Sequence, residues 1–138
     1  MSISIKEVKA RYPEAEAFKF GDSRKLCDRL LALVRTGKKR ATCGALRSFD
    51  ADDEPLPVVG RRDIALDWDG NPAFVVETTA VTICRFCDVE EDFALAEGED
   101  ETLESWQAGH QAYFERNGGW QSDMKLVCER FTLVEDFA

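Results

Sequence analysis

The feature that most restricts the fold is a pair of apolar stretches, 63–68 (DIALDW) and 72–86 (PAFVVETTAVTICRF), separated by Asp69-Gly70. Stretches rich in β-branched and aromatic residues are typical of strands. An Asp-Gly dipeptide between two strands is typical of a tight hairpin turn. The sequence therefore predicts an antiparallel hairpin in the middle of the chain.

Helical patterns lie on both sides of this hairpin, and one further strand follows them. The expected elements are helices over 4–12, 20–39 and 102–116, a short helix with a tight acidic turn within 88–100, a loop over 51–63, and a last strand over 124–137. In the second helix, Asp22 or Ser23 can cap the start and Gly37 supplies the stop. Helices, strands, helices and a strand in this order predict an α+β protein with a mostly antiparallel sheet.

Composition narrows the function classes. A chain of 138 residues fits one domain, and none of its apolar runs approaches the roughly 20 residues that span a bilayer. The first residues lack the apolar core of a secretion signal, so we expect a cytoplasmic protein without a membrane partner, and five reduced cysteines. A net charge of −9 argues against broad binding to duplex nucleic acid, although a local basic cleft remains compatible with it.

Two sequence clusters suggest metal binding at first sight. Cys84 and Cys87 form a CxxC, but a structural zinc site needs two further ligands and the only histidine is His110. Residues 88–104 contain nine carboxylates and no cation, which a solvated helix surface largely explains. The sharper part is EGED at 97–100, where Gly98 allows a tight turn that presents Glu97 and Glu99 together. Its spacing does not match a calcium loop, and we expect neither a metal nor another cofactor.

Three further groups of residues are candidates for a binding cleft. Trp106 and His110 lie one helical turn apart on the same face of the last helix. Such a face most often packs in the core. The alternative is that the two side chains form the wall of a cleft, where a base could stack on them. Glu77 interrupts an apolar strand and faces either solvent or a cleft. The cations Lys38, Lys39 and Arg40 follow a helix end, where positive charge is favoured, and they also suit the mouth of an anion-binding cleft.

Several of these motifs, in this order, resemble the ASCH domain family. The quoted similarity comprises FGDS, LCDRLLALVRTGKKRAT, LPVVG, IALDWDGNPAFVVETTAVTI, FCDVEEDFALAEGED and TLESWQAGHQAYF, from about Phe18 to Val134. The resemblance implies a small PUA-like β-barrel of mostly antiparallel strands with flanking helices. It also implies a single domain over 1–138, in which 1–17 form an N-terminal helical extension.

The family resemblance implies several activities. ASCH domains are proposed to bind RNA, one member is described as a ribonuclease, and a shorter bacterial member is an N4-acetylcytidine amidohydrolase. The Lys-x-x-Thr pair and later Glu of that enzyme match Lys39, Thr42 and Glu99, which are therefore the candidate catalytic residues. The candidate substrate-binding residues are Lys38, Arg40, Arg61, Glu77, Glu97, Trp106 and His110.

This sequence also departs from its relatives. Gly60 is followed by Arg61 and Arg62, where many relatives have Gly-Asp, and the acidic signature EGEDE lacks a second Gly. The expected ligand is a nucleoside or short single-stranded RNA, and the sequence leaves the oligomeric state open between a monomer and a homodimer. RNA binding without catalysis and metal-dependent RNA cleavage are the alternatives to amide hydrolysis.

The chemistry of amide hydrolysis leaves the role of Lys39 open. As an ammonium group it would polarise the carbonyl; with its pKa lowered by Lys38, Arg40 and partial burial, it would take the proton of Thr42. Glu99 would act as a base or orient Lys39, and a close pair with Glu99 opposes a lowered pKa. Residues 39 and 42 would point to opposite faces of one strand, so a turn or bulge is required, and Gly37 supplies one.

Overall fold

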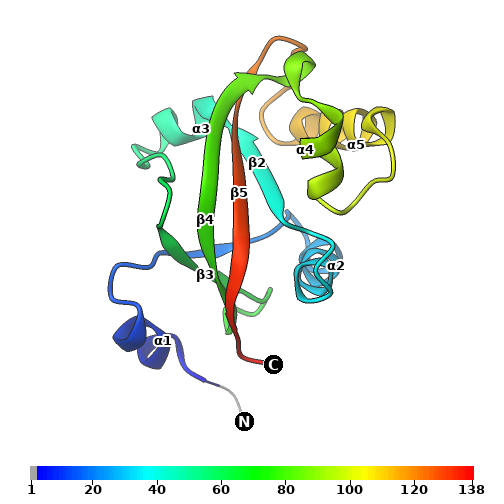
Figure 1. Cartoon of the computed structure of the whole chain (residues 1–138). Helices are drawn as coiled ribbons and strands as arrows, with labels where there is room; N and C mark the ends of the chain where they lie inside the picture. Colours follow the sequence, from blue (N-terminus) through cyan, green and yellow to red (C-terminus); the bar gives the residue numbers. More distant parts are fainter. Residues whose placement is uncertain (1–2) are drawn as a thin grey trace.

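A computed structural model describes residues 3–138 of the chain (Figure 1). Its elements are α1 (Ile5–Arg11), β1 (Ala17–Lys19), α2 (Arg24–Arg35), β2 (Ala41–Ala45), α3 (Leu46–Ala51), β3 (Arg62–Leu66), β4 (Pro72–Arg85), a 3-10 turn η1 (Phe86–Asp88), α4 (Glu91–Ala96), α5 (Leu103–Arg116) and β5 (Lys125–Asp136).

The strands form one five-stranded sheet in the order β1-β3-β4-β5-β2. β1 pairs with β3 in parallel, and the other three pairings are antiparallel. The hairpin expected at Asp69-Gly70 joins β3 to β4, with Gly70 at a φ of 90°. The prediction of an α+β fold with a mostly antiparallel sheet and flanking helices is therefore confirmed.

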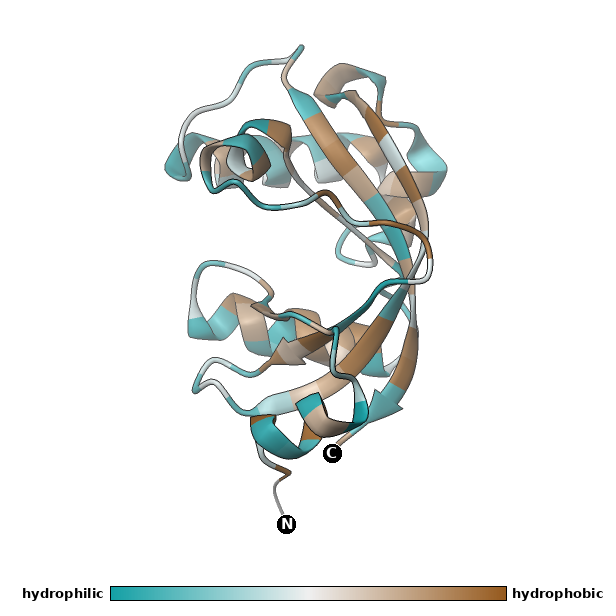
Figure 2. Cartoon of the chain, turned by 90° about the vertical axis from the view of Figure 1, so that its left-hand side faces the viewer, coloured by the Kyte–Doolittle hydropathy of each residue, from teal (hydrophilic) through white to brown (hydrophobic). Residues whose placement is uncertain are grey.

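The sheet is bent along its two longest strands. β4 and β5 pair over most of their length, and their register shifts between Val75 and Val76 and again between Thr78 and Ala80. Such irregularities bend strands and increase their twist. Figure 2 shows the result: α2 lies at one end of the bent sheet, and α3 and α5 lie at the other end, facing it across the concave side.

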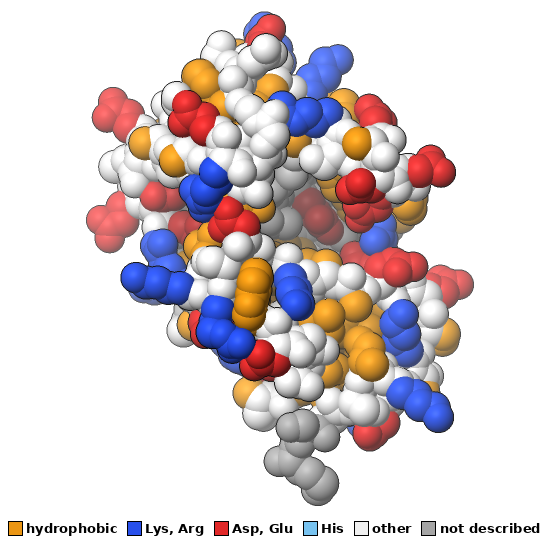
Figure 3. All heavy atoms as spheres, turned by 180° about the vertical axis from the view of Figure 1, so that it is seen from behind, with side chains coloured by type: hydrophobic (Ala, Val, Ile, Leu, Met, Phe, Trp, Pro, Cys, Tyr) orange, Lys and Arg blue, Asp and Glu red, His pale blue; other side chains and the backbone are white. Residues whose placement is uncertain are grey.

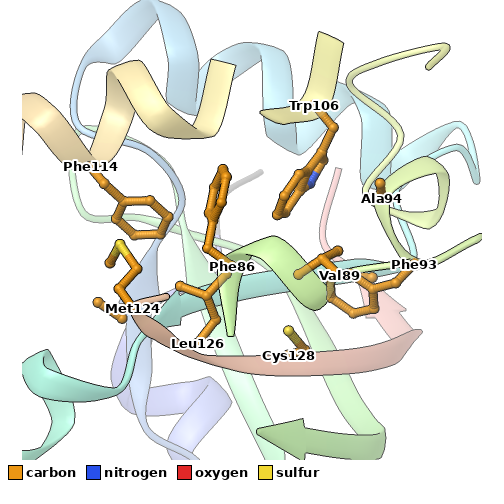
Figure 4. Packing of buried hydrophobic residues seen from close by; sticks show 11 residues of the cluster. Phe86, Val89, Phe93, Ala94, Trp106, Phe114, Met124, Leu126 and Cys128 are labelled. Atoms are coloured by element: carbon orange, nitrogen blue, oxygen red, sulfur yellow. The ribbon is translucent and has the colours of Figure 1, made fainter. Parts of the chain in front are cut away.

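The end of the sheet that carries α4 and α5 is held by an aromatic core (Figure 4). Phe86 lies between Trp106 and Phe114, with its ring stacked on Trp106 at 5.3 Å and edge-on to Phe114 at 6.4 Å. Leu126 and Cys128 of β5 close this core from the sheet. It fixes α5, and with it the residues that α5 presents to the concave side.

Two other clusters hold the opposite end. Cys27, Leu30, Leu31 and Val34 of α2 pack on Phe20, Phe74 and Phe131, as expected from the helical spacing of the leucines. Val8 of α1 packs on the outer side against Ile64 and Val75. α1 starts with a capping box in which Ser4 and Glu7 satisfy each other's backbone amides.

Several boundaries differ from those that the sequence suggests. α2 begins after Ser23, which accepts a hydrogen bond from the amide of Leu26, and it ends at Arg35, so Lys38 and Lys39 lie outside it. β1 and α3 were not expected, because three and six residues are too few for a periodic pattern. Residues 1–2 of the expected N-terminal extension lie outside the described residues.

Of the expectation of no membrane partner, the structure tests only the part that concerns membrane-spanning helices. Between residues 3 and 138, no helix has the length and apolar character that a membrane crossing requires.

Candidate functional site

Two adjoining hollows lie on the concave side of the sheet. The first has a volume of about 250 Å³ and is lined by Arg61 and Glu129, among others. The second has a volume of about 270 Å³ and is lined by Lys39 and Glu99, among others. The residues that line both hollows are Phe20, Gly21, Thr42, Cys43 and Tyr113. Figure 3 shows this face of the molecule hollowed between its two ends, with acidic side chains around the hollow. Small-molecule sites typically measure about 300–1,000 Å³, so the two hollows together have the size of a site for a small ligand.

Lys39 lies buried at the base of the second hollow. Its side chain is 1% exposed, and Nζ lies 3.3 Å from Oε1 of Glu97, 3.4 Å from the carbonyl oxygen of Glu97 and 3.4 Å from Oε2 of Glu99. The ring of Phe20 covers Nζ at 5.7 Å. Three acceptors thus surround a group with three N–H donors, which satisfies an ammonium ion away from bulk water.

The acidic turn reaches Lys39 through a close backbone contact. Gly98 has a φ of 80°, and a Cβ at this position would lie 2.5 Å from the carbonyl oxygen of Lys38. The amide of Arg40 donates to the carbonyl oxygen of Ala96 at 2.7 Å. The glycine expected to allow a tight turn therefore also allows the turn to pack directly on the segment before β2, with Glu97 and Glu99 on the two sides of Lys39.

Lys39 and Thr42 line the same hollow despite their spacing of three. β2 begins only at Ala41, and Gly37, with a φ of 85°, ends α2 and turns the chain toward the sheet. Lys39 therefore precedes the strand and escapes its alternation. The turn at Gly37 precedes Lys39, and Lys39 and Thr42 reach the same hollow because residues 38–40 are not part of the strand.

Glu97 connects Lys39 to α5. Its Oε2 accepts a hydrogen bond from Nε1 of Trp106 at 2.8 Å and lies 3.3 Å from Nε2 of His110. Burial by itself would raise the pKa of this carboxyl, but the charges of Lys39 and His110 and the donated hydrogen bonds outweigh it and hold the pKa at about 2. Glu97 is therefore a buried carboxylate.

His110 completes this network and stacks on Trp106, with ring centroids 4.3 Å apart. Its Nδ1 lies 3.0 Å from the carbonyl oxygen of Trp106. Burial lowers the pKa of His110, yet its hydrogen bond to the Glu97 carboxylate and the negative charge there raise it above the usual value. Both ring nitrogens thus face acceptors, as a doubly protonated imidazolium requires.

The first hollow also contains a half-buried carboxyl, that of Glu129. Glu129 of β5 pairs directly across the sheet with Thr42 of β2, and both residues line the hollow. Thr78 donates a hydrogen bond to Oε1 of Glu129. Burial, together with the nearby charge of Asp63, raises the pKa of Glu129, and the hydrogen bond from Thr78 only partly opposes this.

The other candidate residues from the sequence are distributed over several places. Arg61 lines the first hollow and is paired with Asp63 at 3.0 Å. Lys38 and Arg40 are exposed and do not line either hollow. Glu77 pairs with Arg62 at 2.9 Å and also lies outside both hollows. The structure therefore brings together Lys39, Thr42, Glu97, Glu99, Trp106 and His110.

One group of side chains has the composition of a metal site. Ligand atoms of Cys43, Glu97 and His110 lie within 4.8 Å of one another. Glu97 already accepts from Lys39, Trp106 and His110, and burial raises the pKa of the Cys43 thiol well above its usual value. The carboxylate and imidazole thus form a closed network with an ammonium group, which is unfavourable for a further cation.

The five cysteines are free, as expected. The CxxC does not form a site: Cys87 is exposed, whereas Sγ of Cys84 lies 3.7 Å from Sγ of Cys128. Sequence reasoning also overlooked residues that line the hollows, above all Glu129, Asp63 and Tyr113. A carboxylate within the apolar pattern of 124–137 was the available signal for Glu129, but its position opposite Thr42 depends on strand register.

Comparisons with known proteins agree with this architecture. A family model described as "ASCH domain" matches residues 16–135. A crystal structure of a protein from Enterococcus faecalis V583 is similar with a TM-score of 0.85 and 32% identity, covering 96% of this chain and 86% of that chain. An ASCH domain from Lactobacillus crispatus JV V101 has a TM-score of 0.82 and 32% identity, covering 96% and 87%.

A more distant structure, the ASCH protein of Zymomonas mobilis, is 10% identical with a TM-score of 0.51, over 86% of this chain and 67% of that chain, and is similar in fold alone. No curated protein matches the sequence.

Proposed function

The chain belongs to the ASCH domain family, and from this premise we propose that it is an amidohydrolase that removes the acyl group of an N4-acylated cytidine nucleoside. The observation that carries the proposal is the position of Thr42. This hydroxyl-bearing residue lies where the two hollows meet, and Lys39 and Glu99 line the second hollow with it.

The residues suit a two-step acyl transfer. Thr42 Oγ1 attacks the acyl carbon, and its proton passes to Glu99. Once protonated, Glu99 no longer holds the N–H of Lys39, and this N–H then stabilises the oxyanion. The C–N bond then breaks, the exocyclic nitrogen takes a proton, and an acyl ester remains on Thr42. Water hydrolyses this ester, and Thr42 Oγ1 recovers its proton. The three acceptors around Nζ favour Lys39 as the ammonium group of this mechanism.

Charge in the hollows supports a neutral nucleoside in preference to a nucleic acid strand. Four carboxylates and two Lys or Arg side chains line the first hollow. Three carboxylates, three Lys or Arg side chains and His110 line the second. Arg61 is paired with Asp63 and Arg116 with Asp22. A strand of phosphates requires free cations along its path, whereas aromatic walls such as Phe20 and Tyr113 suit a single base.

The test is incubation of the purified protein with N4-acetylcytidine, followed by chromatography for cytidine. Wild-type protein is expected to release cytidine. Thr42→Val, which removes the hydroxyl and keeps the shape, is expected to abolish turnover without loss of folding. Thr132→Val is the matched control, because Thr132 is exposed on β5 and lines neither hollow.

Release of cytidine by Thr42→Val at the wild-type rate would contradict the proposed nucleophile. Absence of turnover by folded wild-type protein would contradict the proposed function. Salt-dependent binding of a single-stranded oligoribonucleotide would then support the RNA-binding alternative. Oligonucleotide cleavage that a chelator abolishes would support a metal-dependent ribonuclease.

A further inference from the structure

Amide hydrolysis needs a proton donor as well as a proton acceptor. The leaving nitrogen of an amide is strongly basic and departs readily only when it is protonated as the C–N bond breaks. Lys39 and Glu99 line the second hollow, where the proposed mechanism uses them on the nucleophile and the carbonyl oxygen. A donor to the nitrogen would have to approach Thr42 from its other side.

Glu129 occupies that side. It lines the first hollow with Thr42, while Lys39, Glu97 and Glu99 line only the second. Residues directly opposite each other in an antiparallel pair have Cβ atoms about 4.5–5.5 Å apart on the same face of the sheet, and Glu129 is opposite Thr42. A substrate whose acyl carbon lies at Thr42 thus has Lys39 on one side and Glu129 on the other.

The carboxyl of Glu129 is held so that one oxygen remains available. Thr78, itself 1% exposed, donates to Oε1, and within residues 3–138 no hydrogen bond is formed by Oε2. Oε2 is not fully buried, so solvent in the hollow reaches it. The hydrogen bond from Thr78 fixes the carboxyl beside Thr42.

We propose that Glu129 is the proton donor to the leaving exocyclic nitrogen, a role that rests on the amidohydrolase function proposed above. The protonated carboxyl transfers its proton to the nitrogen as the C–N bond of the tetrahedral intermediate breaks, which releases the amine and leaves Glu129 as a carboxylate. In the second step this carboxylate takes a proton from the water that attacks the acyl ester of Thr42. Glu99 returns its proton to Thr42 Oγ1, and both carboxyl groups regain their starting states.

The carboxyl groups of Glu129, on the sheet, and Glu97, in the acidic turn, have opposite environments. Burial raises the pKa of Glu129, which favours the protonated form that a donor needs. Lys39 and His110 keep Glu97 ionised instead. Glu97 therefore serves as the counter-charge of Lys39, and Glu129 is the carboxyl whose surroundings favour the protonated form.

The experiment compares two substrates that differ in their need for a proton donor. N4-acetylcytidine has a basic leaving nitrogen, whereas p-nitrophenyl acetate releases a stable anion. Glu129→Gln keeps the size of the side chain and an acceptor for Thr78, but it removes the transferable proton. We expect this variant to lose about 10²–10⁴-fold in kcat on the amide, the range typical of general acid catalysis. The rate of the p-nitrophenol burst from the ester, which reports acylation of Thr42 alone, is expected to stay within a few-fold of wild type.

The matched control is Glu135→Gln, on the same strand. Glu135 contacts Arg11 and Tyr12 and lines neither hollow, so its substitution is expected to leave the amide-to-ester ratio unchanged. An unchanged ratio in Glu129→Gln, with wild-type protein active on the amide, would overturn the role of Glu129 and leave the proposed function intact. Absence of amide turnover by wild-type protein would overturn both.

A measurement on wild-type protein keeps the proposal testable if Glu129→Gln does not fold. The donor works only when protonated, so kcat for the amide is expected to fall as pH rises through the pKa of Glu129, while the rate of the p-nitrophenol burst from the ester lacks this fall. The other titratable or charged side chains that line the hollow around Glu129 are Glu16, Lys19, Glu54, Arg61, Asp63, Cys43 and Tyr113. An amide-to-ester ratio that is constant with pH would overturn the proposal.

Discussion

Nζ of Lys39 lies 3.3 Å from Oε1 of Glu97, and each of the two side chains is at most 2% exposed. Charges buried this deeply are costly unless each has a partner. The pair joins the segment before β2 to the acidic turn after α4, and through Trp106 and His110 it reaches α5. The elements around the second hollow are therefore joined by one network of ion pairs and hydrogen bonds.

Removal of the cation from this pair is expected to destabilise the protein. Lys39→Met leaves the Glu97 and Glu99 carboxylates without their shared partner, so the free energy of unfolding should fall by about 3 kcal/mol. Urea unfolding measures this change. Lys38→Met, at the exposed neighbouring position, should shift it by less than about 0.5 kcal/mol. Equal effects of the two substitutions would contradict the pairing.

The same pair gives the protein a particular sensitivity to acid. The pKa of Glu97 is about 2 in the folded protein and 4.5 ordinarily. A lowered pKa contributes stability that is fully present above pH 4.5 and is lost as pH falls toward 2, on the order of 3 kcal/mol. Urea unfolding at several pH values should show this loss in wild-type protein, and Glu97→Gln should show a smaller dependence. An identical dependence in both proteins would refute the assignment.

His110 should remain protonated above its usual range. Its pKa is raised by the Glu97 carboxylate against the effect of burial, so its contribution to stability is present at low pH and is lost as pH rises through the folded-state pKa. Because His110 is the sole histidine, one imidazole resonance in an NMR titration reports on it. Glu97→Gln should lower the measured pKa, and a titration unchanged by this substitution would show that Glu97 is not the cause.

Much of the fold could be predicted from local patterns. The Asp69-Gly70 turn specifies the β3–β4 hairpin, and the leucine spacing specifies α2. The elements that escaped prediction have little local signal. β1 covers only Ala17–Lys19, and its parallel pairing with β3 arises from tertiary packing and not from any turn.

The candidate site divides in the same way. Lys39, Thr42 and Glu99 stand out in sequence because of their motifs, and the structure brings all three to the second hollow. Glu77 and Glu129 are similar by sequence, since each interrupts an apolar strand. Register and the bend of β4 decide that Glu129 faces Thr42 while Glu77 pairs with Arg62 outside the hollows. Neither property can be read from one strand alone.

The contact between the acidic turn and the segment before β2 depends on Gly98. In Gly98→Ala the new methyl group would meet the carbonyl oxygen of Lys38 at 2.5 Å and the amide nitrogen of Lys39 at 2.8 Å. Gly70 has a similar φ of 90° with nothing within 4 Å, so Gly70→Ala has the cost of a left-handed backbone alone, about 1–3 kcal/mol. Urea unfolding should show a larger loss for Gly98→Ala, because displacement of the turn also weakens the Glu97–Lys39 pair. Equal losses would mean that the turn shifts without disturbing that pair.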